Sequence, residues 1–144
     1  MSKLLQVYEH EGLRVTFDAR RCIHAAECIR HLPQVFDASA RPWITPERAG
    51  ANDVIAAVQR CPTGALHVAL NDEPVSLPAE DVSVKAMRNG PLYVRGAARI
   101  INEPGEEILV DERFALCRCG ASRRKPFCDG SHRASGFRDP IERP

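Results

Sequence analysis

The chain of 144 residues carries a formal net charge of +1, and only 6% of its residues are aromatic. This length suits one ordinary domain or two very small ones, and a domain of about 70 residues often needs a bound metal because it buries little apolar surface. Charges of both signs interleave along the chain, which gives no reason to expect binding to nucleic acid or to a membrane.

Apolar spacing predicts two strands and two short helices in the first half of the chain. In chain order these are a strand at residues 13–17, a helix at 25–31, a helix through Val54 and Val58, and a strand at 65–70. Asn52 or Asp53 is the expected N-cap of the second helix, which delivers Cys61 at its C-terminal end. Trp43 and Ile44 are expected to be extended, because prolines flank them.

Three cysteines of the first half, Cys22, Cys28 and Cys61, are spaced like part of a ferredoxin motif. Bacterial ferredoxins use C-x2-C-x2-C followed by a distant Cys-Pro. Here Ala25 occupies the place of the second cysteine, and Pro62 follows Cys61. Free cysteines are also common as buried apolar side chains. The spacing therefore leaves two interpretations open, a metal site and a set of core thiols.

This part of the chain resembles the divergent single-cluster 4Fe–4S ferredoxin family. The resemblance lies in the C-x-H-x3-C opening from Cys22 to Cys28 and in the segment Pro42-Trp43-Ile44. It covers about residues 8–70. It implies that the three cysteines, including Cys61, bind a 3Fe–4S or 4Fe–4S cluster.

A 4Fe–4S cluster needs a fourth ligand, which the three cysteines do not supply. His24 is the nearest candidate, although it stands one position before the vacant place. Solvent or Asp37 are the alternatives. A histidine at this place can equally hydrogen-bond to a cluster sulfur or cap the following helix.

The second half of the chain predicts a linker and then a small sheet. Residues 71–81 are polar and contain prolines, which is typical of a linker. Alternating residues then predict strands at 82–86, 92–94, 97–101 and 107–110. Asn89-Gly90 and Pro104-Gly105 mark two of the turns, since Asn and Gly accept a positive φ.

Residues 117–132 read CRCGASRRKPFCDGSH and place three thiols and one imidazole close together. These are Cys117, Cys119, Cys128 and His132. Such a set is compatible with structural zinc and with an iron–sulfur cluster. Zinc knuckles usually have two or more residues between their first cysteines, whereas here a single arginine separates Cys117 from Cys119.

The run is similar to the CDGSH iron–sulfur (NEET-type) domain. It matches the pattern C-x-C-x2-S-x3-P-x-C-D-G-S-H throughout, with Ser122 and Pro126 in the intermediate places. The ligands that this resemblance implies for a 2Fe–2S cluster are Cys117, Cys119, Cys128 and His132. A neutral imidazole in place of a thiolate raises the reduction potential, and acid displaces it from iron, so we expect a labile cluster.

Four basic residues, Arg118, Arg123, Arg124 and Lys125, crowd the same run, in which Asp129 is the only acidic residue. They are interpreted as a docking face for an acidic redox partner, as a counter-charge to the cluster, or as a solvated loop. Asp129 is the expected N-cap of a short helix whose positive end faces the cluster.

Other functional signals are absent from the sequence. It contains no nucleophile–base set, phosphate-binding glycine loop or nucleotide fingerprint, so we expect no enzymatic activity. The start of the chain lacks the apolar stretch of a secretion signal, and a cytoplasmic protein is expected. In that compartment thiols are available as ligands rather than paired in disulfides.

Together these features predict an α+β protein with a small ferredoxin-like cluster domain at residues 1–70, a linker at 71–81 and a small β-rich CDGSH iron–sulfur domain at 82–144. The favoured function is one-electron transfer between redox partner proteins, which are expected to be acidic. The alternatives are an iron–sulfur cluster carrier or assembly factor, which donates clusters to apo-proteins, and a redox or pH sensor. A homodimer is slightly favoured over a monomer.

Overall fold

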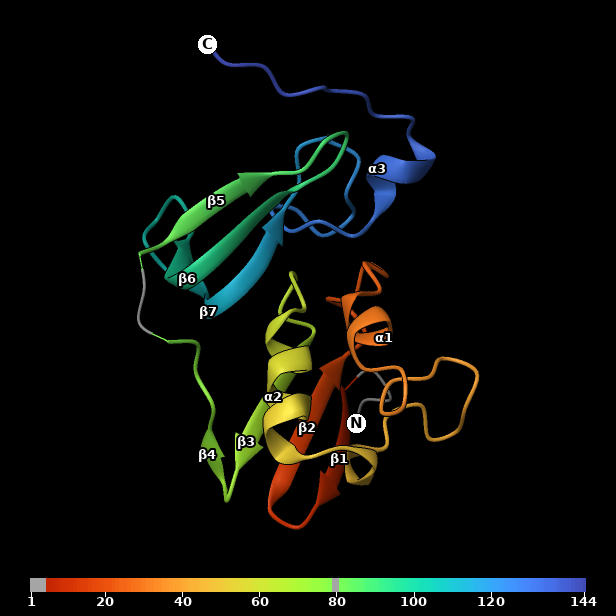
Figure 1. Ribbon diagram of the computed structural model, residues 1–144. Coiled ribbons are helices and arrows are strands. Elements are labelled where there is room, and N and C mark those ends of the chain that lie inside the picture. Colours follow the sequence, from red (N-terminus) through yellow and green to blue (C-terminus); the bar gives the residue numbers. More distant parts are fainter. Residues whose placement is uncertain (1–4, 79–80) are drawn as a thin grey trace. The chain divides into compact units, whose positions relative to one another are not determined.

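The computed structural model describes residues 5–78 and 81–144, and the chain divides into two units (Figure 1). Unit 1 comprises the residues up to 61 together with 65–76, and unit 2 comprises 62–64 and 77–144. Each unit contains a small antiparallel sheet. Within the described residues, no helix is long and apolar enough to cross a membrane.

Unit 1 is built on a four-stranded sheet in the order β1-β2-β3-β4. Its strands are β1 (Leu5–His10), β2 (Leu13–Asp18), β3 (Leu66–Leu70) and the short β4 (Glu73–Pro74). Tight turns join β1 to β2 and β3 to β4, and they place Gly12 at φ 84° and Asn71 at φ 50°. A side chain at position 12 would collide with the Asn71 side chain, so these neighbouring turns need glycine there.

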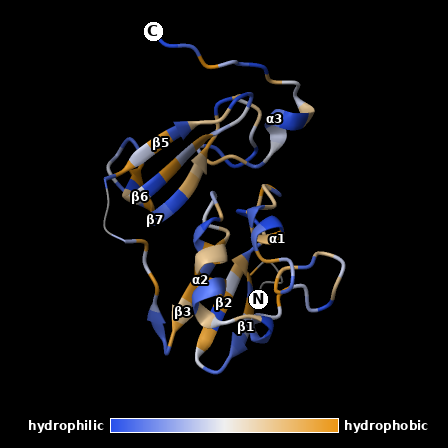
Figure 2. Cartoon of the chain, viewed as in Figure 1, coloured by the Kyte–Doolittle hydropathy of each residue, from blue (hydrophilic) through white to orange (hydrophobic). Residues whose placement is uncertain are grey.

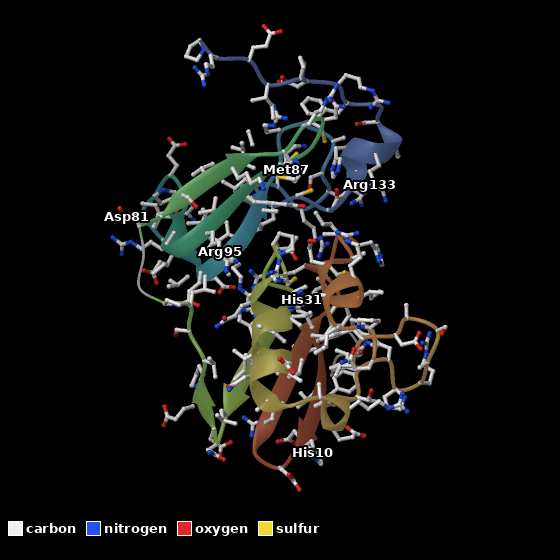
Figure 3. The ribbon with its side chains drawn as sticks, in the orientation of Figure 1. His10, His31, Asp81, Met87, Arg95 and Arg133 are labelled. Atoms are coloured by element: carbon white, nitrogen blue, oxygen red, sulfur yellow. The ribbon has the colours of Figure 1, made fainter. Side chains whose placement is uncertain are left out.

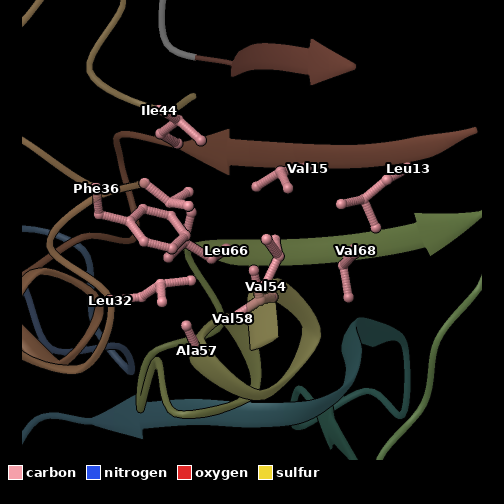
Figure 4. Packing of buried hydrophobic residues seen from close by; sticks show 11 residues of the cluster. Leu13, Val15, Leu32, Phe36, Ile44, Val54, Ala57, Val58, Leu66 and Val68 are labelled. Atoms are coloured by element: carbon pink, nitrogen blue, oxygen red, sulfur yellow. The ribbon is translucent and has the colours of Figure 1, made fainter. Parts of the chain in front are cut away.

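Short helical segments complete unit 1 and enclose its core. They are α1 (Glu27–His31), the 3-10 turn η1 (Pro46–Arg48) and α2 (Ala51–Gln59). Buried apolar residues alternate with more exposed ones at the start of β2 and of β3, which gives this part of the sheet one apolar face (Figure 2). Val15 and Leu66 from that face, Val54 from α2 and Phe36 from the intervening loop are buried together (Figure 4).

Unit 2 has a three-stranded sheet in the order β5-β6-β7. Its elements are β5 (Ser83–Ala86), β6 (Leu92–Ile101), β7 (Glu107–Leu116) and the one-turn helix α3 (Ser131–Ala134). The long β6–β7 hairpin is irregular between Arg95 and Ala98. Val94 and Phe114 pair across it and are buried, and Phe127 meets Phe114 edge-on at 6.5 Å between ring centroids.

The predicted mixture of strands and few helices is confirmed, but some boundaries differ. Residues 92–94 and 97–101 belong to one strand, β6, because the bulge carries the pairing through. The strand predicted at 107–110 continues to Leu116 in β7. The predicted linker at 71–81 contains β4, which pairs with β3, and its residues 79–80 lie outside the described part.

Two further features of unit 1 differ from the prediction. The helix α2 begins at Ala51 with Gly50 as its N-cap, so neither Asn52 nor Asp53 caps it. Strand β1 was not predicted, because its hydropathy pattern is inverted. Its outward residues Leu5 and Val7 are apolar and about half exposed.

Candidate metal centres

The C-terminal ligand loop, residues 117–132, leaves the sheet at the end of β7 and returns beside that end. The Cys117 N–H donates a hydrogen bond to the Pro126 carbonyl at 2.8 Å, and the Cys128 N–H donates to the Ala115 carbonyl at 2.9 Å. These bonds continue the sheet pairing into the loop. They hold the first and third cysteines of the motif at its base.

The four predicted ligands of this loop form two pairs. The Sγ atoms of Cys117 and Cys119 are 3.9 Å apart, and the Cys128 Sγ lies 3.6 Å from the His132 Nδ1. For a tetrahedral metal bound about 2.3 Å from sulfur and about 2.1 Å from nitrogen, the expected separations are about 3.8 Å and about 3.6 Å. Each pair therefore has the spacing of two ligands on one tetrahedral metal atom.

The arrangement as two pairs bears on the kind of metal centre. A 2Fe–2S cluster takes two protein ligands on each iron, whereas a structural zinc ion takes four ligands around one metal. The two pairs are neighbours, since the charges of Cys117 and Cys119 act on the Cys128 thiol. The arrangement is therefore compatible with a cluster that two pairs of ligands would hold.

Ser122 and Asp129 fix the shape of the loop from within. The Ser122 hydroxyl donates to the Phe127 carbonyl at 2.6 Å. The Asp129 carboxylate accepts the backbone N–H groups of Ser131 at 3.0 Å and Arg123 at 2.9 Å. These hydrogen bonds, with Ser131 first, hold the pKa of Asp129 at about 2. The carboxylate therefore serves as a fixed acceptor at any ordinary pH.

The helix that carries His132 begins one residue later than predicted. Gly130, not Asp129, is the N-cap of α3, and it adopts a φ of 88°. Glycine takes this left-handed conformation at little cost, which explains its place in the motif. The helix is a single turn, and His132 is its second residue.

Backbone N–H groups point at two of the ligand sulfurs. The Ala121 N–H donates to the Cys119 Sγ at 3.3 Å, and the Gly130 N–H donates to the Cys128 Sγ at 3.4 Å. Such bonds stabilise negative charge on a thiolate and raise the potential of a cluster that it binds. The loop is thus shaped for thiolate ligands.

The titration of the ligand side chains depends on how deeply each is buried. Burial raises the pKa of Cys128. Burial also opposes ionisation of Cys117, but hydrogen bonds from the backbone of Ser122 and Gly120 outweigh it, and the pKa of Cys117 is lowered. Burial, with the charge of Arg133, lowers the pKa of His132 and favours the neutral imidazole that a metal requires.

Arg118 is a structural residue of the loop rather than part of its exposed basic surface. Its Nε donates to the Gly90 carbonyl at 2.8 Å and its Nη2 to the Met87 carbonyl at 2.8 Å. Its Nη1 donates to Asp139 at 2.9 Å, and its guanidinium lies 5.1 Å from the centre of the Phe137 ring. Arg118, with 17% of its side chain exposed, therefore contributes little to the exposed basic surface of the loop.

The other three predicted docking residues remain exposed. Arg123, Arg124 and Lys125 lie at the outer part of the loop. Arg133, which follows His132 on α3 and is also exposed, is labelled in Figure 3. The exposed basic residues of this region are therefore Arg123, Arg124, Lys125 and Arg133, and Arg118 is not among them.

In unit 1, three separate elements bring Cys22, Cys28 and Cys61 near one another. Cys22 lies in the loop after β2, Cys28 lies in α1, and Cys61 follows α2, with its N–H donating to Val58 at 3.0 Å. Burial raises the pKa of Cys28 to about 11, and the charges of Cys61 and Cys22 add to the shift. The three thiols therefore share one neighbourhood, which a metal would convert from repulsion to attraction.

The structure separates the protein candidates for the fourth ligand of unit 1. The His24 N–H donates to the Cys22 Sγ at 3.4 Å, and the His24 side chain lines the same pocket as Cys22 and Cys28. The Asp37 carboxylate instead accepts hydrogen bonds from the Ser39 N–H at 2.9 Å and hydroxyl at 2.6 Å. His24 therefore stays a candidate ligand, whereas Asp37 is committed to its own turn.

Sequence reasoning did not find the pocket beside these cysteines. Its aromatic residues Tyr8, Phe17 and Trp43 come from β1, β2 and the following loop. Of these, only Trp43 had stood out in the sequence, as part of a family-like segment. The pocket depends on the sheet edge at β1, which the hydropathy pattern did not predict.

Comparison with known proteins finds two families matched by successive segments of this chain. A family described as "Divergent 4Fe-4S mono-cluster" matches residues 8–71, and one described as "Iron-binding zinc finger CDGSH type" matches residues 89–133. The chain is also 32% identical over 59 residues to the protein described as "Uncharacterized protein YjdI" of Escherichia coli, from strains K12 and O157:H7. That alignment covers 41% of this chain and 78% of the relative.

Both matched segments contain all the predicted ligands of their sites. The order of the two matches is also the order inferred from the cysteine spacing. The chain therefore belongs to the iron–sulfur proteins, in which a divergent 4Fe–4S mono-cluster domain is followed here by a CDGSH-type iron-binding domain.

Proposed function

We propose that the protein is a one-electron carrier with two iron–sulfur clusters. The residues that would hold a 2Fe–2S cluster in unit 2 are Cys117, Cys119, Cys128 and His132. The residues that would hold a 3Fe–4S or 4Fe–4S cluster in unit 1 are Cys22, Cys28 and Cys61, with His24 as the candidate fourth ligand. When bound, each cluster would supply a site that gains or loses one electron.

The hydrogen bonds to sulfur are the observation that carries this proposal. Backbone N–H groups donate to Cys22 in unit 1 and to Cys119 and Cys128 in unit 2 at 3.3–3.4 Å. These donors are fixed by the loop backbone before an electron arrives. Preorganised dipoles reduce the rearrangement that accompanies a change in cluster charge, which favours rapid electron transfer.

A second candidate function is donation of the 2Fe–2S cluster to an apo-protein. The observation that favours it is the position of His132, which is partly exposed on the single turn of α3. A ligand there can be reached by solvent protons and can leave without unfolding the sheet. The same lability would serve a redox or pH sensor.

The proposal also covers the compartment and the partners of the protein. We propose a reducing compartment such as the cytoplasm, where thiols stay available as ligands. We propose no catalytic role. The exposed Arg123, Arg124 and Lys125 favour redox partners with acidic surfaces.

The test begins with the purified, anaerobically prepared full chain. Iron and sulfide are counted, and paramagnetic resonance is recorded before and after stoichiometric reduction. Two distinct reduced-state signals, one of them typical of a histidine-ligated 2Fe–2S cluster, are expected. A colourless protein that binds only zinc would refute both candidate functions.

A second step separates the two functions. The reduced holo-protein is mixed with an oxidised ferredoxin, and the oxidised holo-protein with an apo-ferredoxin. Rapid oxidation of the protein with its iron retained supports electron transfer. Movement of intact cluster to the apo-ferredoxin, without that rapid oxidation, supports donation instead.

A further inference from the structure

Unit 1 contains a pocket of about 430 Å³ whose aromatic lining the proposed electron transfer does not require. The volume lies within the range of about 300–1,000 Å³ that is typical of small-molecule sites. Cys22 and Cys28 line the pocket, and so do three aromatic side chains, Tyr8, Phe17 and Trp43. The pocket therefore adjoins the candidate cluster site.

The aromatic walls are held in place by contacts among themselves. The rings of Phe17 and Trp43 meet edge-on, with 4.9 Å between their centroids. The Trp43 Nε1 donates to the Gln6 Oε1 at 3.2 Å, and the Tyr8 hydroxyl donates to the same oxygen. A planar ring entering this space would meet walls that need no rearrangement, which lowers the cost of binding.

Arg41 supplies a positive charge to the pocket lining, and the lining residues in the described part of the chain include no Asp or Glu. The Arg41 Nη1 is held by the Ala38 and Ala40 carbonyls. Burial raises the pKa of Tyr8, and the positive charge of Arg41 acts against that rise, so the field of the guanidinium reaches the aromatic wall. The Arg41 guanidinium favours an anion.

The cluster itself would not use the whole pocket. Cys61, the third predicted cysteine ligand, is not part of the pocket lining, whereas the aromatic residues Tyr8, Phe17 and Trp43 are. The pocket therefore extends past the residues that would hold the cluster.

We propose that this pocket binds a small planar aromatic carboxylate next to the cluster of unit 1. The ring lies among Tyr8, Phe17 and Trp43, and the carboxylate faces Arg41. The site does not depend on electron transfer. Its proximity to Cys22 makes a bound ligand a neighbour of the cluster.

The test uses the holo-protein and benzoate as the probe. Acetate carries the charge without the ring, and benzamide carries the ring without the charge. Trp43 is the only tryptophan of the chain, so its fluorescence reports on the pocket directly. Saturable binding of benzoate is expected, at least about tenfold tighter than that of either control compound, since a charge-assisted hydrogen bond is lost with benzamide.

Substitutions then locate the site. Arg41→Gln is expected to weaken benzoate binding at least about tenfold, and Arg41→Lys to restore most of it. The matched control is Arg48→Gln, an exposed arginine of unit 1 outside the pocket lining, which should leave the affinity unchanged. Equal binding by the Arg41→Gln and Arg48→Gln proteins overturns the proposal.

The proton resonances of benzoate give a second, independent measurement. The cluster of unit 1, in its paramagnetic oxidation state, should broaden them in the wild-type protein, because the bound ring lies close to it. Binding without such broadening, in a protein shown by iron analysis to contain the cluster, places benzoate elsewhere and overturns the proposal. The absence of saturable binding up to about 10 mM does the same. Failure of electron transfer to partners leaves these results unaffected.

Discussion

Arg118 and Asp139 form a 2.9-Å ion pair that ties the C-terminal ligand loop to the tail of the chain. The arginine stands between two predicted cluster ligands, and only 17% of its side chain is exposed, against 45% for the aspartate. The Asn89 N–H also donates to the Asp139 carbonyl at 3.1 Å, and the Asp139 N–H donates to Asn89 at 2.7 Å. The turn, the loop and the tail therefore form one hydrogen-bonded unit.

Replacing Arg118 by Gln should destabilise unit 2 and shorten the lifetime of its cluster. The change removes hydrogen bonds to two backbone carbonyls and to Asp139, and the expected cost is about 2 kcal/mol. Urea unfolding and the rate of loss of visible absorbance measure the two effects. Arg123→Gln, at an exposed position of the same loop, is the control. Equal unfolding midpoints for the two variants would contradict the structural role of Arg118.

The effect of Asp139 should depend on pH in a defined direction. Its pKa is lowered, chiefly by the hydrogen bond from the Ile141 N–H and further by Arg118. A lowered folded-state pKa gives a contribution that is present above the unfolded value, about 3.9, and is lost as the pH falls through the folded value. Asp139→Asn should therefore differ from wild type between pH 5 and pH 8 and converge with it in acid, once the pH is below the lowered folded-state pKa. Unfolding midpoints across this range check the convergence, and a difference that grows in acid would be inconsistent with it.

Exchanging the predicted histidine ligand should change both potential and stability of the cluster. In the His132→Cys protein a thiolate replaces a neutral imidazole, so adding an electron becomes harder and the potential falls. The cluster should also be lost more slowly in mild acid, because no imidazole remains for protons to displace. Redox titration and absorbance decay at pH 5–6 measure these effects. His31→Ala, at an exposed position of α1, should match wild type. If His132→Cys also matches wild type, His132 is not a ligand.

Loss of a ligand in one unit should leave the cluster of the other unit intact. Each site draws its predicted cysteines from a single unit. Cys61→Ser should therefore remove the signal of the unit 1 cluster alone, and Cys119→Ser that of the unit 2 cluster alone. Iron content per chain and paramagnetic resonance distinguish the two. Loss of both signals from either variant would mean that the units do not fold or assemble independently.

The exposed basic residues of the loop should govern the association rate with acidic partners. Lys125→Glu is expected to slow electron transfer to an acidic ferredoxin several-fold at low ionic strength and little at high salt, where charges are screened. Lys85→Glu makes the same change of charge at an exposed position of β5 and is the control. Stopped-flow rates over a salt series make the comparison. Parallel salt dependences for the two variants would exclude the loop as the docking surface.

Much of unit 1 follows from local patterns. Leu13 and Val15 are alternate residues of β2, and Leu66 and Val68 are alternate residues of β3. Val54 and Val58 lie one helical turn apart on the buried face of α2. The edge strand β1 does not follow from local patterns. Its pairing with β2, rather than its own hydropathy, determines its place. The pocket beside β1 cannot be predicted from local patterns for the same reason.

In the ligand loop of unit 2, too, some features follow from the local sequence and others depend on distant contacts. Its cysteine and histidine spacing identifies a metal site, because these side chains lie too close in sequence to be separated widely in space. Whether they surround one ion or form two pairs depends on the Cys117–Pro126 and Cys128–Ala115 hydrogen bonds, which close the loop. The role of Arg118 likewise depends on residues 28 to 31 positions earlier and 21 later in the chain.

The sequence by itself therefore determined the class of cofactor, the order of the two sites and most of the residues at each, since ligand chemistry and short spacing are local properties. Only the tertiary structure decided that the ligands of unit 2 are paired, that Arg118 is committed to Asp139, and that an aromatic pocket adjoins Cys22. Each of these depends on contacts between segments far apart in the chain, and such contacts arise from packing and hydrogen bonding that no local pattern encodes.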